Sequence, residues 1–117
     1  CCHNYVLFGN GEALIVAVPY VFDQSGFVVA PYARPNPRFW LRSVKQRLYR
    51  GRCVNNEYVE SSLQIFRDNE KQIYRLVDEQ AGLKPYVRKE ITRYIEDFYE
   101  LINDARDVEQ KIIDDCI

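Results

Sequence analysis

The first third of the chain carries short apolar runs that are separated by turn-forming residues. Residues 4–8 predict one strand, and the Asn10-Gly11 dipeptide after them predicts a hairpin, because both residues tolerate positive φ. The apolar run 13–22 predicts a second strand and residues 27–33 predict a third, with a Ser-Gly turn between them. We therefore expect a three-stranded antiparallel β-meander over residues 1–35.

A short basic amphipathic helix is predicted next, over residues 36–52. Asn36 suits the N-cap, Pro37 suits the first helical position, and Gly51 can end the helix in a left-handed conformation. Cations recur on one face of this helix at helical spacing. They are Arg38, Arg42 and Lys45.

Two long helices with a short connection are predicted over residues 56–117. The first runs over 57–80. The second begins at Pro85 and carries an unbroken heptad pattern of about 30 residues, which corresponds to roughly 45 Å. The short connection makes the pair an antiparallel helical hairpin. Further apolar residues widen the apolar face of the last helix, so this helix is expected to contact more than one neighbour. They include Ile95, Tyr99 and Ile102.

The predicted fold class is α+β: a β-meander, a short basic helix and a long helical hairpin in a single domain, residues 1–117. The 47% hydrophobic and 14% aromatic content favours a packed globule over a disordered chain. No apolar run approaches the roughly 18 residues of a membrane-spanning helix, so no transmembrane segment is expected. Nucleotide-binding, EF-hand, zinc-protease and serine-hydrolase motifs are absent. This favours a non-enzymatic function without a cofactor or an evident small-molecule ligand.

Charge is segregated along the chain, although the net charge is only −1. No Asp or Glu occurs from Gln24 to Asn56, whereas the part after Cys53 holds 15 acids against 9 bases. One interpretation is a site for nucleic acid or another polyanion, with aromatic residues to stack on bases. The favoured interpretation is that these cations pair with the acidic helices of the same chain, since the pI is 5.9. The candidate anion-binding residues are Arg38, Arg42, Lys45 and Arg50.

Four cysteines and the absence of methionine indicate a processed chain. Removal of a leader would place it in an oxidising compartment, as a secreted or otherwise exported protein. Trimming of Met, excision from a longer chain and a lipidated Cys1 are alternative histories. We expect two disulfides in which Cys1 and Cys2 each pair with Cys53 or Cys116, because a bond between adjacent cysteines is strained.

The amino-terminal cysteines allow two other interpretations. With His3 and one further cysteine they would form a Cys₃His zinc site, but adjacent ligands are poor metal geometry. An exposed Cys1 could be a nucleophile that its own α-amine activates.

The leading functional prediction is a protein-interaction or assembly module that uses the helical hairpin to bind a partner or a second copy. The predicted contact residues are Ile95, Tyr99 and Ile102. Polyanion binding through the basic segment 34–52 is the alternative, and an enzyme with Cys1 as nucleophile is the second alternative.

Overall fold

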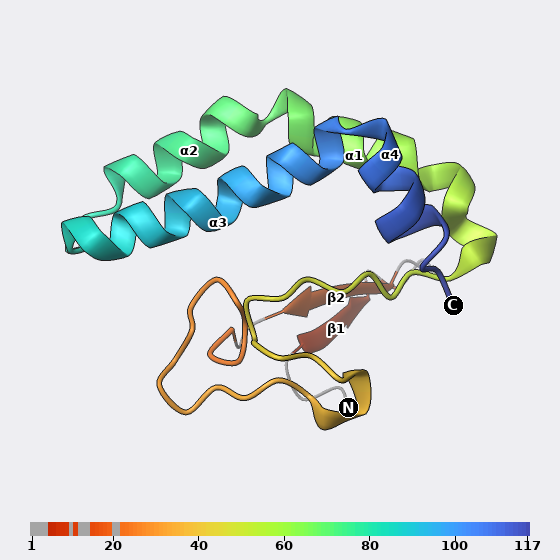
Figure 1. Ribbon diagram of the computed structural model, residues 1–117. Helices are drawn as coiled ribbons and strands as arrows, with labels where there is room; N and C mark the ends of the chain where they lie inside the picture. The colour runs from red at the N-terminus through yellow and green to blue at the C-terminus, as the bar shows by residue number, and fades with distance from the viewer. Residues whose placement is uncertain (1–4, 10, 12–14, 20–21) are drawn as a thin grey trace. The chain divides into compact units, whose positions relative to one another are not determined.

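The computed structural model describes residues 5–9, 11, 15–19 and 22–117. The chain divides into two compact units, residues 1–47 and 48–117, and each is described by itself. The described chain is predominantly helical, and all four α-helices belong to the second unit (Figure 1). The α+β prediction with a three-stranded meander is therefore wrong.

The first unit contains one antiparallel pair of strands among the residues described. Strand β1 (Tyr5–Gly9) pairs with β2 (Ile15–Pro19), with Tyr5 opposite Pro19 and Gly9 opposite Ile15. The connection spans five residues, and it includes Gly11 at φ +81°. Pro19 ends β2, in accord with its lack of a ladder donor. Among the described residues the sheet has two strands, in the order β1-β2.

The third predicted strand is replaced by consecutive turns. The backbone N–H groups of Ser25, Val29 and Ala33 bond to carbonyls three or four residues earlier, at 2.8–3.0 Å. Val29 has φ +51°, which no strand residue adopts. Pro31 supplies no donor at all. Because these N–H groups are bonded within the segment, few backbone donors remain for pairing with a neighbouring strand.

The predicted basic helix is reduced to one 3₁₀ turn, η1 (Pro37–Phe39). Asn36 does cap this turn, since its Oδ1 accepts from the N–H of Arg38 at 3.0 Å. Trp40 then takes the left-handed conformation with φ +54°, and the helix cannot continue. Polar side chains bind the backbone beyond it and compete with helical bonding. The Gln46 Oε1 accepts from the N–H of Arg42, and the Ser43 Oγ accepts from that of Lys45.

One long helix was predicted over 57–80. The second unit instead begins with three shorter helical segments. A 3₁₀ segment, η2 (Cys53–Tyr58), leads into α1 (Val59–Asp68), and α2 (Glu70–Glu79) follows after a break at Asn69. The side chain of Asn69 causes a local competition for bonding, because its Nδ2 donates to the carbonyl of Ile65 at 2.7 Å. Gly82 has φ +82° in the turn that follows α2.

Helix α3 (Pro85–Asn103) runs back along α2, with Pro85 at its first position as predicted (Figure 1). The predicted unbroken heptad helix is wrong beyond Asn103. Asp104 is extended, and its Oδ1 accepts from the N–H groups of Arg106 and Asp107 at 2.8 and 3.0 Å. It thereby caps a new helix, α4 (Ala105–Val108), which passes into a π-helical turn, η3 (Glu109–Ile113).

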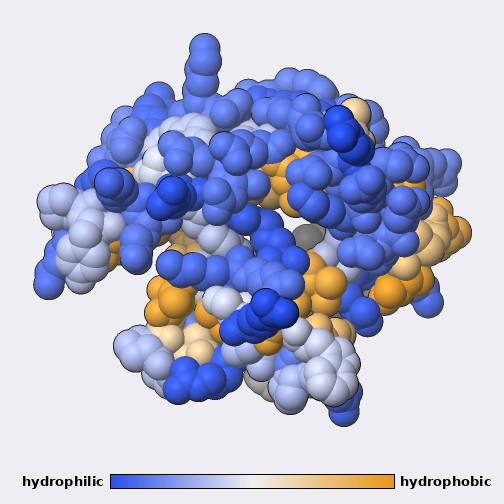
Figure 2. All heavy atoms as spheres, in the orientation of Figure 1, coloured by the Kyte–Doolittle hydropathy of each residue, from blue (hydrophilic) through white to orange (hydrophobic). Residues whose placement is uncertain are grey.

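Seven buried apolar residues form the core of the second unit, and they come from α1, α2, α3 and η3. Hydrophilic residues cover much of the outer side of these helices (Figure 2). This is the arrangement expected when amphipathic helices bury their apolar stripes against one another. The core residues are Val59, Leu63, Val77, Ile95, Tyr99, Ile102 and Ile112.

A disulfide between Cys53 and Cys116 joins the start of the second unit to its end, over a sequence separation of 63 residues. Backbone bonds reinforce this link. The N–H of Cys53 donates to the carbonyl of Ile117 at 3.1 Å, and the N–H of Ile117 donates to the carbonyl of Gly51 at 2.9 Å. The last residues of the chain are therefore fixed beside residues 51–53.

Candidate interaction surfaces

The three predicted partner-binding residues lie in the core. Ile95, Tyr99 and Ile102 are 6%, 3% and 0% exposed, because α1 and α2 pack on this face of α3. They contact other residues of the same unit, so in this conformation they offer no surface to a partner. The residues that widen the apolar face of the last helix therefore form part of the core.

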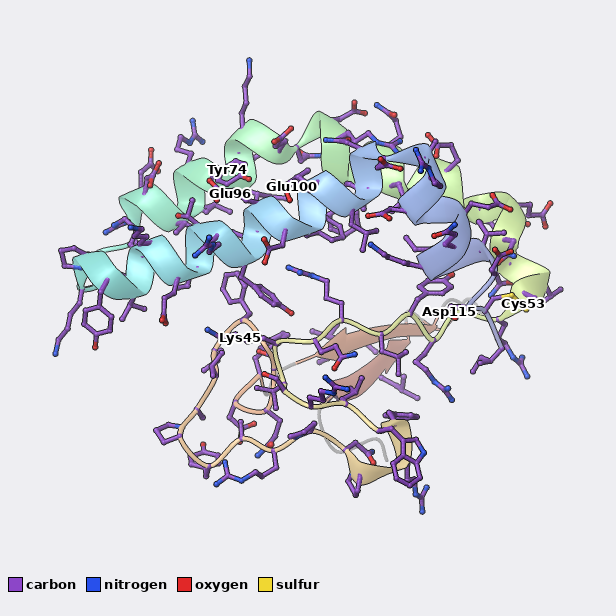
Figure 3. All side chains as sticks on the ribbon, in the orientation of Figure 1. Lys45, Cys53, Tyr74, Glu96, Glu100 and Asp115 are labelled. Carbon is purple, nitrogen blue, oxygen red and sulfur yellow. A yellow bond between two sulfur atoms is a disulfide. The ribbon has the colours of Figure 1, made fainter. Side chains whose placement is uncertain are left out.

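Tyr99 connects this core to the end of α1. Its hydroxyl donates to the backbone carbonyl of Phe66 at 2.9 Å. Burial raises the pKa of the Tyr99 phenol above its ordinary value, and the carboxylate of Glu70 raises it further. Tyr74, beside Glu96 and Glu100 in Figure 3, has its pKa raised by burial and then by neighbouring carboxylates.

Four aromatic rings form a continuous row through the second unit. Phe66 contacts Phe98 edge to face, with centroids 5.2 Å apart. Phe98 contacts Tyr99 at 5.5 Å, and Tyr99 contacts Tyr74 at 5.8 Å. Since such pairs have preferred angles and distances, this row holds α1, α2 and α3 at fixed separations.

Two arginines satisfy the carbonyls at helix ends, which have no partner within their own helix. Arg67 of α1 donates to the carbonyl of Ile102 near the end of α3 at 2.6 Å, and also pairs with Glu60 at 2.6 Å. Arg88 of α3 donates to the carbonyls of Val77, Asp78 and Gln80 at the end of α2. Arg67 thus caps the end of α3, and Arg88 caps the end of α2. These bonds indicate a structural role for both cations.

An open groove of about 580 Å³ lies on the surface of the second unit, and most of its lining is apolar. One wall comes from η2 and α1, where lining positions recur every three or four residues and therefore share a face. Phe98 of α3, Ile112 of η3 and Tyr49 complete it. Tyr58 and Phe66 are exposed, although both carry large aromatic rings. The residues of this groove used below are Tyr49, Tyr58, Ser62, Phe66, Phe98 and Ile112.

Acidic residues adjoin this groove in the sequence. Glu57 precedes Tyr58 and Asp97 precedes Phe98, and both carboxylates are on exposed residues. Neither forms an ion pair with another residue in the part of the chain that the structure describes. The second unit as a whole has 15 Asp and Glu against 11 Lys and Arg. The groove is thus an apolar surface in an acidic unit.

The observed disulfide differs from the predicted pairing. Cys53 bonds to Cys116, whereas each had been expected to pair with Cys1 or Cys2. The pairing is possible because η2 and η3 bring the two ends of the second unit within a Cα–Cα distance of 5.0 Å. Cys1, Cys2 and His3 lie outside the described residues, and so do the predicted amino-terminal zinc site and Cys1 nucleophile. Among described residues, no group of three potential metal ligands is found.

The predicted anion-binding residues do not share a helical face, because the helix that would align them is absent. Arg38, Arg42 and Lys45 are exposed in the turns of the first unit, where Lys45 is labelled in Figure 3. Arg50 is exposed in the second unit. Within the described ranges, none of the first three is in an ion pair. The acidic helices belong to the other unit, so the pairing of these three cations with them stays a prediction.

Comparisons with protein-family models, with curated proteins and with solved structures found no match to this chain. Among the described residues, no helix is both long and apolar enough to cross a membrane.

The groove was not predicted from the sequence. Phe66 and Phe98 fall on the apolar stripes of the two predicted helices, and nothing in the heptad pattern distinguishes them from core residues. The one available signal was Asp104. An Asp followed by Ala-Arg-Asp suits an N-cap, and a second helix start there would have indicated a turn that brings Ile112 back to α1.

Proposed function

We propose that the second unit is a non-enzymatic protein-interaction module whose groove binds a segment of a partner protein. The main support for this proposal is the apolar groove itself, with the large rings of Tyr58 and Phe66 exposed at its wall. Exposed apolar surface of this kind marks interaction sites in folded proteins, where buried aromatic anchors supply most of the binding free energy.

The proposed partner segment carries an apolar side chain flanked by Lys or Arg. The apolar side chain would fill the groove, and the cations would face the acids at Glu57 and Asp97. Charge complementarity of this kind raises association rates and excludes wrong partners. The groove has room for one large side chain or a short peptide segment, since about 580 Å³ lies within the usual range for ligand pockets.

The disulfide supports this proposal because it fixes two parts of the groove. Ile112 lies four residues before Cys116, and Tyr49 lies four residues before Cys53. The Tyr49 ring packs against Gly51, where a side chain would collide with it. A groove that is held in place before binding loses less conformational entropy when the partner arrives. We also propose an oxidising compartment as the location, because disulfides persist there.

A phage-displayed peptide library, selected on the intact disulfide-bonded protein, tests this function. We expect enriched peptides that carry an aromatic or aliphatic residue between basic residues, with binding that weakens as salt is added. Ser62→Phe places a ring in the groove and should abolish binding of these peptides. Ser61→Phe is the matched control, because Ser61 is the exposed neighbour that does not line the groove.

Three results would contradict the proposal: no enrichment, enrichment of acidic peptides, or equal loss of binding in both serine variants. Sedimentation velocity of the protein alone separates a partner from a second copy. A concentration-dependent dimer that Ser62→Phe disrupts and Ser61→Phe does not would assign the groove to self-association instead.

A further inference from the structure

The first unit exposes apolar residues that a packed domain would bury. Val6, Leu7 and Phe8 are consecutive in β1, and all three are exposed. Because successive strand residues point to opposite faces, neither face of β1 is covered. Figure 2 shows apolar residues at the surface of this unit. Among its described apolar residues, Ala33 is the buried one. The unit therefore presents aliphatic and aromatic surface to its surroundings.

Trp40 is the most exposed large apolar residue of the described chain, at 92%. Its φ of +54° is a strained conformation for a bulky residue, which costs about 1–2 kcal/mol. The turns around it are fixed by the bonds from Asn36 to the N–H of Arg38 and from Gln46 to the N–H of Arg42. Strained residues that the surroundings hold in place cluster at functional sites. The chain thus holds an exposed indole ring on a strained backbone.

Cations surround this indole in the sequence. Arg38 and Arg42 lie two residues to either side of Trp40, and Lys45 follows. All three are exposed, and none forms an ion pair with a described residue of the first unit. Asp23 is the one acid among the described residues of the unit. The segment 36–46 therefore combines an exposed indole with three cations.

We propose that segment 36–46 binds the surface of an anionic phospholipid bilayer, with Trp40 at the level of the head groups and Arg38, Arg42 and Lys45 against the lipid phosphates. Indole rings favour this position because they are apolar with one polar N–H, and anionic lipid attracts nearby cations. Single-stranded nucleic acid would also accept an aromatic ring and cations. Exposed Val and Leu, however, gain from contact with acyl chains and have no role in stacking on bases.

Trp40 is the only tryptophan in the sequence, so its fluorescence reports this contact directly. We expect phosphatidylcholine vesicles that contain phosphatidylglycerol to shift its emission to shorter wavelength, and brominated lipids to quench it. Vesicles of phosphatidylcholine alone and soluble glycerol phosphate should do neither. Added salt should release the protein, because screening weakens attraction between exposed charges.

Vesicle flotation of variants tests the residues. Arg38→Gln with Arg42→Gln should weaken binding to anionic vesicles roughly thirty-fold, and Trp40→Ala should also release the protein. Arg75→Gln with Arg93→Gln is the matched control, which removes the same charge from exposed residues of the second unit and should leave binding unchanged.

The proposal is overturned if anionic vesicles neither shift nor quench Trp40 at low salt, or if the control pair loses binding equally. It is also overturned if a dT oligonucleotide binds through Trp40 while vesicles do not, since that result assigns the segment to nucleic acid. Binding of the vesicles by the Ser62→Phe variant separates this test from that of the groove.

Discussion

The hydroxyl of Tyr99 in α3 donates to the backbone carbonyl of Phe66 in the last turn of α1, at 2.9 Å. Phe66 lies three residues before the break at Asn69, whose backbone N–H is shared between the carbonyls of Ile65 and Phe66 at 3.3 and 3.2 Å. The same Phe66 forms part of the groove wall. One hydrogen bond therefore links the core, the break between α1 and α2, and the proposed binding surface.

Replacing Tyr99 with Phe keeps the ring and removes this bond. We expect the free energy of unfolding to fall by about 1 kcal/mol, because the carbonyl of Phe66 loses one of its two donors in a partly buried position. Urea unfolding followed by far-UV circular dichroism measures the change. Tyr86→Phe is the control, since Tyr86 is exposed and its change should stay within about 0.5 kcal/mol. Equal effects from both variants would contradict a role for the Tyr99 hydroxyl.

The raised pKa values of Tyr99 and Tyr74 predict a loss of stability in alkali. A raised pKa in the folded protein means that folding favours the protonated phenol. This contribution is complete below the ordinary tyrosine pKa of 10.0 and is lost as the pH rises through the folded values. We expect the urea midpoint to fall as the pH rises above about 10. The fall should be smaller in the Tyr99→Phe variant. A urea midpoint of the parent protein that does not change over this pH range would refute the prediction.

The sequence located the helices of the second half better than their ends. Pro85 begins α3 as predicted, because its missing N–H is not needed at the first position. Asn69 and Asp104 broke the two predicted helices, and both do so through side-chain bonds to the nearby backbone. Periodicity is insensitive to such bonds, since a single polar residue barely alters an apolar stripe.

The first half was predicted poorly for a related reason. Trp40 and Val29 adopt positive φ, although neither residue type favours it. Apolar content predicted a strand at 27–33, and capping residues with the spacing of cations predicted a helix after Asn36. In both segments, turns satisfy backbone donors instead. No propensity assigns a left-handed conformation to tryptophan, so this break was beyond sequence reasoning.

The sequence predicted the candidate sites less well than the helices. A stripe identifies residues that will be covered, but it does not say whether the cover is the same chain or a partner. Ile95, Tyr99 and Ile102 were predicted to face a partner, and α1 and α2 cover them instead. Phe66 lies on the apolar stripe of α1 and is nevertheless exposed at the groove. The packing of α1 and α2 on α3, and the return of the chain after Asp104, decide between these outcomes.

Arg67 provides a prediction about the junction of α1 and α3. Arg67→Met keeps much of the aliphatic stem and removes the bonds to the carbonyl of Ile102 and to Glu60. We expect the free energy of unfolding to fall by about 1–2 kcal/mol, after allowance for the partial exposure of the guanidinium. The control is Arg75→Met, which breaks an exposed pair with Glu79 at 3.5 Å and should cost less than about 0.5 kcal/mol. A cost for Arg67→Met no larger than this would show that the cap is dispensable.

The Cys53–Cys116 disulfide should dominate the stability of the second unit. Closing a loop with a sequence separation of 63 residues restricts the unfolded chain, and we expect its loss to cost about 4 kcal/mol. Urea unfolding of the Cys53→Ser, Cys116→Ser double variant measures this cost, and reductant should destabilise the parent protein by a similar amount. Reductant should then have little further effect on the unfolding of this unit in the double variant. Since the bond also holds the segments that carry Tyr49 and Ile112, the double variant should bind groove-selected peptides more weakly, even under conditions where it remains folded. A peptide map that links Cys53 to any cysteine other than Cys116 would contradict both expectations.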